Sequence, residues 1–173
     1  MPSSYQAPKR EDKETSATYS QTAGTNLKKE IATVAHLLEG KGADVFSIRP
    51  AETLGNAVKA LRDKRIGALV VTDETGSLIG ILSERDIVRK LAETPGQTLP
   101  QQVGDVMTDK VETCGKDEAL VSVLRRMTAG RFRHMPVVED GRLFGVITIG
   151  DVVNYRLKEL EHEALQLKQL IVG

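Results

Sequence analysis

Two short motifs in the sequence place a carboxylate three residues after a hydroxyl. They are Ser83-x-x-Asp86 and Thr148-x-x-Asp151, and each lies where a β-rich run gives way to a helical pattern. A hydroxyl at the start of a helix lies beside free backbone N–H groups and the positive end of the helix dipole, which favour a phosphate. A carboxylate one turn later can accept hydrogen bonds from the vicinal hydroxyls of a ribose. The same spacing is that of a helix cap, and the two roles are compatible.

A second group of residues with binding chemistry forms one strongly basic stretch. Guanidinium groups suit phosphate because they donate paired hydrogen bonds. If the segment is extended, Arg131 and Arg133 share one face and Phe132 points the other way. The alternative is a solvated face in which the arginines pair with Glu139 and Asp140. The members, all within residues 125–142, are Arg125, Arg126, Arg131, Phe132, Arg133, His134 and Arg142.

The sequence contains none of the common motifs for metal binding or hydrolysis. There is no Cys-x-x-Cys, His-Glu-x-x-His, P-loop or Gly-x-Ser-x-Gly pattern. Cys114 is the single cysteine, and we interpret it as a small core residue because burial in apolar surroundings raises the pKa of a thiol. We therefore expect no catalytic residue and no metal site.

Composition excludes several classes of protein. The 173 residues carry 24 Lys and Arg against 24 Asp and Glu, and only 3% are aromatic. Zero net charge and few aromatic rings argue against nucleic-acid binding. No apolar run approaches the length of a membrane span. The single cysteine fits a reducing compartment, and with no secretory signal we predict a cytoplasmic protein. Residues 1–26 are polar and predict a disordered tail.

The rest of the sequence is an internal repeat. Residues 45–91 align with 111–157 at an offset of 66, which falls to 65 after a one-residue gap near Thr75. The intervening residues 94–102 have the composition of a linker. A repeat of this length indicates a duplicated supersecondary unit, and two copies usually pack about a pseudo-twofold axis.

Each repeat predicts the order β-α-β-β-α, which makes the protein α/β (α+β). Apolar residues at helical spacing begin at Leu54 and Leu120, and second helices open at Glu84 and Ile149. The expected strands are residues 45–48, 68–71 and 78–82 in the first repeat, and 111–114, 136–138 and 143–147 in the second.

Paired units of this order resemble the tandem cystathionine-β-synthase (CBS) domain module. The resemblance covers residues 34–160, with units at 34–93 and 103–160. It implies binding of an adenosine-containing ligand in the cleft between the units. The motifs that carry it are Val106-Met107-Thr108, residues 65–71 (RIGALVV), 131–138 (RFRHMPVV), 80–86 (GILSERD) and 145–151 (GVITIGD).

The resemblance assigns roles to the polar residues of both repeats. Asp86 and Asp151 would hold ribose. Arg133 and His134 would reach across the cleft to phosphates held by the opposite unit, where the first repeat has Gly67 and Ala68 instead. The site with Ser83 and Asp86 is therefore expected to suit phosphate better. The residues expected to contact phosphate are Ser83, Thr148, Arg133, His134, Arg131 and Arg85.

By family position, two apolar slots would receive adenine. Ordinary strand packing is the alternative explanation of the same residues. One slot would be lined by Ser47, Ile48, Ala68 and Leu69, and the other by Thr113, Cys114, Met135 and Pro136.

The last helix, predicted over residues 151–171, carries a heptad stripe that extends past the second repeat. We expect it to join two subunits into a homodimer; the alternative is that it folds back over the first repeat. The stripe is Val153, Leu157, Leu160, Ala164, Leu167 and Ile171.

Together these features predict a non-catalytic regulatory module that binds AMP, ADP, ATP or NAD(H), with S-adenosylmethionine less favoured. Ligand binding would change the conformation, which an unidentified partner protein reads. The alternative is a ligand-free scaffolding dimer. An enzyme of nucleotide metabolism would need a base near the cleft, and His134 is the sole candidate.

Overall fold

The computed structural model describes residues 31–172. The predicted tail at residues 1–26 lies outside the described residues. Within the described part, the chain forms five α-helices, one short 3-10 helix and two small sheets. The mixed α and β content predicted from the sequence is confirmed.

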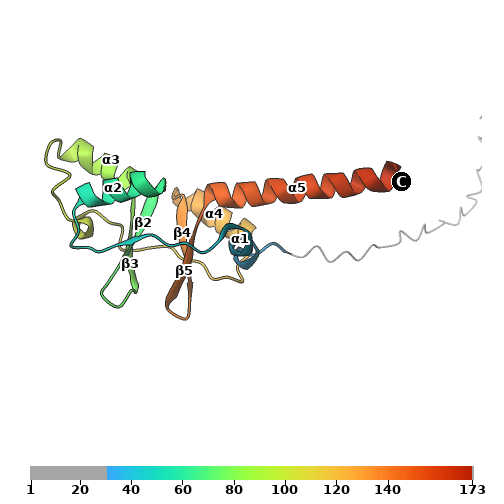
Figure 1. Cartoon of the computed structure of the whole chain (residues 1–173), viewed down its shortest axis with the longest axis horizontal. Coiled ribbons are helices and arrows are strands. Elements are labelled where there is room, and N and C mark those ends of the chain that lie inside the picture. The colour runs from blue at the N-terminus through green and yellow to red at the C-terminus, as the bar shows by residue number, and fades with distance from the viewer. Residues whose placement is uncertain (1–30, 173) are drawn as a thin grey trace, which may run out of the picture. The chain divides into compact units, whose positions relative to one another are not determined.

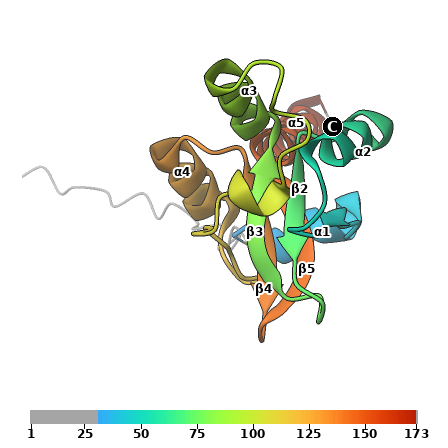
Figure 2. The same cartoon turned by 90° about the vertical axis from the view of Figure 1, so that its left-hand side faces the viewer.

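The first repeat is a three-stranded sheet with two helices. Strand β1 pairs in parallel with β2, and β2 pairs antiparallel with β3, so that the sheet order is β1-β2-β3. Figure 2 shows α2 and α3 gathered at the end of the β2-β3 hairpin that is opposite its turn. The bounds are β1 Ser47–Ile48, α2 Leu54–Lys64, β2 Ala68–Thr72, β3 Leu78–Ser83 and α3 Glu84–Glu93 (Figure 1).

The second repeat follows the same order but lacks a full first strand. Its elements are α4 Leu120–Gly130, β4 His134–Glu139, β5 Arg142–Thr148 and α5 Ile149–Val172. The predicted strand at 111–114 is wrong, because only Cys114 forms a bridge, to Val137. The carbonyl of Thr113 instead accepts a hydrogen bond from the Arg126 guanidinium at 2.6 Å, which takes it out of strand pairing.

The two repeats share details of backbone geometry. Both hairpins have a register shift, between Val71 and Thr72 and between Val137 and Val138. Arg131 ends α4 in the left-handed conformation, with φ of 56°. The condition under which Arg131 and Arg133 would share a face, an extended segment, is not met at Arg131, because its N–H completes the C-terminal turn of α4.

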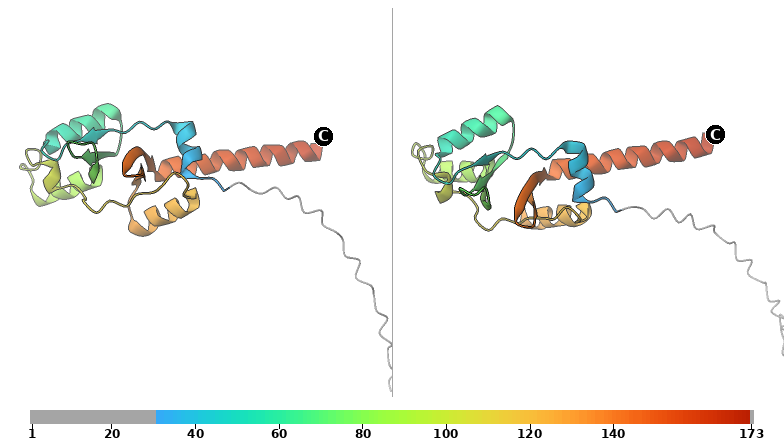
Figure 3. Two further views of the ribbon diagram at one scale, coloured as in Figure 1. Left: turned by 90° about the horizontal axis from the view of Figure 1, so that it is seen from below. Right: turned by 60° about the horizontal axis from the view of Figure 1, so that its bottom comes forward.

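A helix before the first repeat belongs to the core of the second. Helix α1, Val34–Lys41, was not predicted. The N–H of Val34 donates to the carbonyl of Glu118 at 3.0 Å, and the N–H of Leu120 donates to the carbonyl of Ala32 at 2.9 Å. Val34 is fully buried in the core of the second repeat. Both views in Figure 3 show α1 beside α5, with which it is in contact.

The segment between the repeats completes the core of the first in the same way. The N–H of Val103 donates to the carbonyl of Glu52 at 2.8 Å, and Val103 is fully buried in the first core. Residues 94–102, predicted as a linker, are ordered around the buried Thr98, whose hydroxyl donates to the carbonyl of Thr94 at 2.7 Å. Each core is therefore closed by the segment that precedes the other repeat.

The two cores are apolar and separate. The first contains Leu54, Ala57, Leu61, Leu69, Val71, Leu82, Ile87 and Val103. The second contains Val34, Leu37, Cys114, Leu120, Val123, Met127, Met135, Val137, Ile147 and Val152.

Helix α5 carries its apolar stripe into solvent. The exposed fractions of Val153, Leu157 and Leu167 are 42%, 51% and 61%. The alternative in which the helix folds back over the first repeat is wrong, because these side chains stay exposed. No helix in residues 31–172 is both long and apolar enough to cross a membrane.

Candidate functional site

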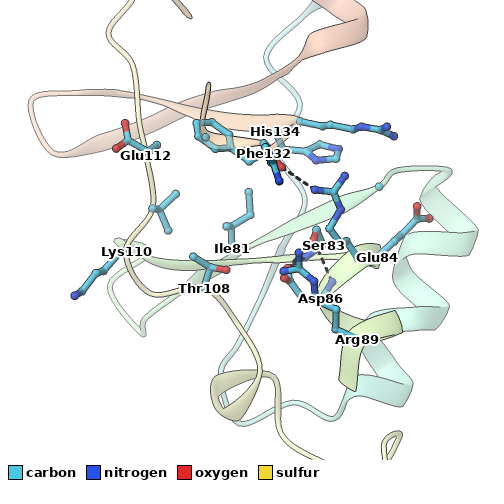
Figure 4. A pocket seen from close by; sticks show the side chains of 16 residues that line it. Ile81, Ser83, Glu84, Asp86, Arg89, Thr108, Lys110, Glu112, Phe132 and His134 are labelled. Carbon is cyan, nitrogen blue, oxygen red and sulfur yellow. Dashed lines mark hydrogen bonds between the residues drawn. The ribbon is translucent and has the colours of Figure 1, made fainter. Parts of the chain in front are cut away.

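A cavity of about 470 Å³ is lined by residues of both repeats. Figure 4 shows the Ser83 and Asp86 wall facing the wall that carries Phe132 and His134. The first repeat contributes Gly67, Ile81, Ser83, Glu84, Arg85, Asp86 and Arg89; the second contributes Val111, Glu112, Gly130, Arg131, Phe132, Arg133 and His134; and the segment that leads into the second contributes Thr108 and Lys110.

Ser83 and Asp86 form a helix cap on one wall of the cavity. Ser83 ends β3 and is the N-cap of α3. The Asp86 Oδ2 atom accepts hydrogen bonds from the Ser83 N–H at 2.9 Å and from the Ser83 hydroxyl at 2.6 Å. The capping interpretation therefore holds in this state. The cap uses one carboxylate oxygen, so the other can accept from a ligand hydroxyl.

His134 packs directly on Gly67 across the cavity. A Cβ atom added at Gly67 would lie 3.1 Å from both Cε1 and Nε2 of the imidazole, so the close approach needs a glycine. Burial lowers the pKa of His134 and outweighs the raising effect of Glu84. A neutral imidazole next to the cavity can donate one hydrogen bond and accept another.

Arg85 joins the two repeats. Its Nη1 atom donates to the carbonyl of Arg131 at 2.7 Å, which places this guanidinium between the walls. The sequence predicted a phosphate contact for Arg85 and did not predict this bridge. The remaining N–H groups of the guanidinium can still face an anion.

Cations outnumber anions around the cavity. Arg85, Arg89, Lys110, Arg131 and Arg133 line it, against Glu84, Asp86 and Glu112. Arg89 and Lys110 are not among the site residues predicted from the sequence. Arg89 lies one helical turn after Asp86 and was open to prediction from that spacing. Lys110 lies between the repeats, where no local pattern indicates which way the chain turns.

Other arginines of the basic stretch lie elsewhere. Arg126 pairs with Glu112 at 2.7 Å and with Glu118 at 2.9 Å. Glu139 accepts a hydrogen bond from the N–H of Lys116 at 2.8 Å. Arg142 lines a second cavity, of about 490 Å³. The stretch is thus divided between the site and structural contacts, and it does not form a single charged face.

The second hydroxyl–carboxylate motif has a different environment. Thr148 and Asp151 cap α5, where the Thr148 N–H donates to the Asp151 Oδ2 at 2.8 Å. The Lys41 ammonium also donates to Oδ2, at 2.5 Å. Burial would raise the pKa of Asp151, but the hydrogen bonds from Lys41 and Thr148 outweigh it and lower the pKa. Neither Thr148 nor Asp151 lines the 470 Å³ cavity.

The residues predicted to receive adenine do not line this cavity. Leu69, Cys114 and Met135 are buried in the two cores, as ordinary strand packing predicts. Burial raises the pKa of Cys114 to about 12, which makes it a poor nucleophile. Ser47 lines the second cavity. The other predicted members, Ile48, Ala68, Thr113 and Pro136, lie in or beside the strands.

No group of three or more His, Cys, Asp or Glu within residues 31–172 is arranged to hold a metal ion.

Comparison with known proteins identifies the family. The sequence pattern of the CBS domain matches residues 42–93 and 103–158. The chain belongs to the CBS-domain family. The resemblance inferred from the sequence is confirmed, and the protein is a tandem CBS pair.

Relatives agree over most of the CBS pair. The CBS domain-containing protein CBSX3, mitochondrial, of Arabidopsis thaliana is 32% identical over 83% of this chain and 74% of its own length. The crystal structure of the CBS-domain containing protein ATU1752 from Agrobacterium tumefaciens is 43% identical, with a TM-score of 0.71 over 73% of this chain and 94% of that one.

A third relative was crystallised with ligands. The CBS domain pair of protein MJ0100, in complex with 5′-methylthioadenosine and S-adenosyl-L-methionine, is 27% identical. Its TM-score is 0.66 over 75% of this chain and 98% of that chain.

Proposed function

We propose that this CBS pair is a non-catalytic sensor that binds a phosphorylated adenosine ligand, such as AMP, ADP, ATP or NAD(H), in the 470 Å³ cavity. The observation that carries the proposal is the placement of Ser83 and Asp86 on one wall and Arg131, Arg133 and His134 on the other. The cavity has the size of a small-molecule site. The adenosine compounds bound by the MJ0100 pair support an adenosine ligand.

The charge of the cavity favours a ligand that carries phosphate. Five lining cations, Arg85, Arg89, Lys110, Arg131 and Arg133, attract phosphate oxygens and repel the sulfonium of S-adenosylmethionine. Asp86, near the start of α3, would accept hydrogen bonds from ribose hydroxyls, while the Ser83 hydroxyl lies at the N-terminus of that helix, where the helix dipole favours an anion.

A ligand in this cavity would bind both repeats at once. It can therefore favour one arrangement of the repeats over another, by its difference in affinity for the two. A partner protein would read this arrangement, and we place the system in the cytoplasm.

The same proposal includes a homodimer formed through α5. Its stripe of Val153, Leu157, Leu160, Leu167 and Ile171 is exposed in the single chain. The spacing of these residues is that of a coiled-coil seam. A second copy of α5 would bury it.

Thermal unfolding tests the ligand proposal. The chain is heated with AMP, ADP, ATP, NAD, NADH or S-adenosylmethionine. A ligand at 100 times its dissociation constant adds about 2.7 kcal/mol of stability, which raises Tm by roughly 5 to 10 °C. The rise should vanish in Asp86→Ala and persist in Asp63→Ala, which removes an exposed carboxylate of α2 outside the cavity. No rise with any nucleotide at millimolar concentration would favour the scaffolding dimer.

A further inference from the structure

The side chain of Lys41, the last residue of α1, is hydrogen-bonded to Asp151, the carboxylate of the second motif. Its Nζ atom donates to the Asp151 Oδ2 at 2.5 Å and to the carbonyl of Val146 at 2.8 Å. The side chains of Lys41 and Asp151 are 37% and 22% exposed, so the pair is partly shielded from water.

Helix α1 holds Lys41 in place from inside the second repeat. Val34 and Leu37 are buried in its core. Leu38 packs on Gly145, where an added Cβ would lie 3.1 Å from the leucine Cδ2. The lysine is therefore presented by an anchored helix, and the pair costs less side-chain ordering than one between two mobile surface residues.

The first repeat has a different arrangement at the matching place. Ile81, the counterpart of Val146 in the repeat, exchanges two backbone hydrogen bonds of 2.9 Å with Thr108. The segment before the second repeat is extended at Thr108, so its backbone pairs with the N–H and carbonyl groups of Ile81 in β3. Helix α1 donates no backbone hydrogen bond to the Val146 carbonyl, and the Lys41 ammonium donates one instead.

In the first motif, by contrast, no lysine in the described part of the chain is bonded to the carboxylate of Asp86, and we call this site open. Lys110, the lysine that lines its cavity, points away from Asp86 in Figure 4. Among residues 31–172, the hydrogen bonds to the Asp86 carboxylate come from Ser83 alone. The two motifs thus share one local pattern but differ in whether a lysine holds the carboxylate.

We infer that Lys41 closes the Thr148–Asp151 site to a ribose diol and thereby determines that ligand binds first at Ser83–Asp86. This inference rests on the proposed function. A ribose reaches Asp151 only in the fraction of molecules in which Lys41 has moved away. The affinity of that site is lower than its intrinsic value by this fraction.

Equilibrium dialysis with AMP tests the inference. Asp86→Ala removes the open site and leaves the second one. Adding Lys41→Ala should tighten AMP binding by about fivefold, because the competing ammonium is gone. Adding Asp151→Ala to that pair should abolish the gain, which would place it at the second site. Lys59→Ala in the Asp86→Ala background removes an exposed lysine of α2 outside the cavity, so it is the matched control and should produce no gain.

Three outcomes would overturn the inference: AMP binding that is unchanged by Lys41→Ala, binding that weakens, or no binding in the double variant. Weaker binding would show that Lys41 contacts the ligand. If circular dichroism shows that Asp86→Ala is unfolded, Asp86→Asn keeps a capping side chain for the same series. The thermal-unfolding panel with the unsubstituted chain tests the proposed function separately. If no nucleotide of that panel binds but AMP binding increases in the double variant, the proposed function and the order of binding are refuted, and only the closure of the second site by Lys41 is supported.

Discussion

Asp86 and Asp151 show how one local motif acquires two electrostatic environments. Both carboxylates accept from the N–H of the residue three positions earlier, so both cap a helix. The difference comes from a third group, because Lys41 adds a charge-assisted hydrogen bond to Asp151 alone. A binding role for either carboxylate depends on this neighbour as much as on the motif.

His134 is the residue whose protonation should affect stability. Burial lowers its pKa in the folded chain, while the unfolded chain keeps the ordinary value of about 6.5. The unfolded state therefore binds more protons between these two values. The contribution of His134 is complete above about pH 6.5 and is lost as the pH falls to the lowered pKa, with a slope of at most about 1.4 kcal/mol per pH unit.

Urea unfolding of the chain at a series of pH values between 5 and 7.5 measures this dependence. His134→Gln removes the titrating group, so its free energy of unfolding should fall less steeply below pH 6.5. His162→Gln, on the exposed part of α5, is the matched control and should keep the original slope. Equal slopes in His134→Gln and the unsubstituted chain would show that His134 does not titrate in this window.

Among the elements, α1 makes the largest difference between the sequence prediction and the structure. The hydroxyl–carboxylate junctions were predictable because strand, cap and helix signals lie within a few consecutive residues. Helix α1 precedes the first repeat but packs on the second, and its backbone meets Glu118 far along the chain. Local sequence patterns do not indicate that a helix preceding one repeat packs on the other. The hydrogen bond between Lys41 and Asp151 could not be predicted from the sequence for the same reason.

A smaller error, at residues 111–114, has a similar origin. The apolar alternation at residues 111–114 was typical of a strand, but Arg126, on α4, binds the carbonyl of Thr113. Arg131 takes a left-handed conformation that is uncommon for a residue with a Cβ, because it ends α4. At Thr113 a contact from α4 outweighs the strand propensity of the segment, and at Arg131 the end of α4 itself fixes the backbone.

The role of α1 as part of the second core can be tested by truncating one side chain. Leu37→Ala should lower the free energy of unfolding by roughly 2 to 5 kcal/mol, because it leaves a cavity beside a well-packed core. Leu165→Ala makes the same chemical change on α5, where the leucine is 59% exposed, and should cost under about 0.5 kcal/mol. Equal costs in urea unfolding would mean that α1 is not docked in solution.

Over the whole described chain, the two repeats depend on each other. Val34 closes the second core and Val103 the first, so neither repeat keeps its core without the other's flanking segment. The hydrogen bond from Arg85 to Arg131 adds a direct tie at the cavity. A ligand bound there would contact two repeats that already share structure.

The exposed stripe of α5 predicts that two chains assemble into a dimer. In sedimentation equilibrium the unsubstituted chain should have twice the mass of one chain. The double variant Leu160→Glu and Leu167→Glu should be monomeric, because unpaired charges in the seam raise the dissociation constant by about a hundredfold or more. Lys158→Glu with Gln166→Glu adds acidic residues off the stripe and should remain dimeric. A monomeric unsubstituted chain would refute the dimer, and a dimeric seam variant would show that a face other than α5 joins the subunits.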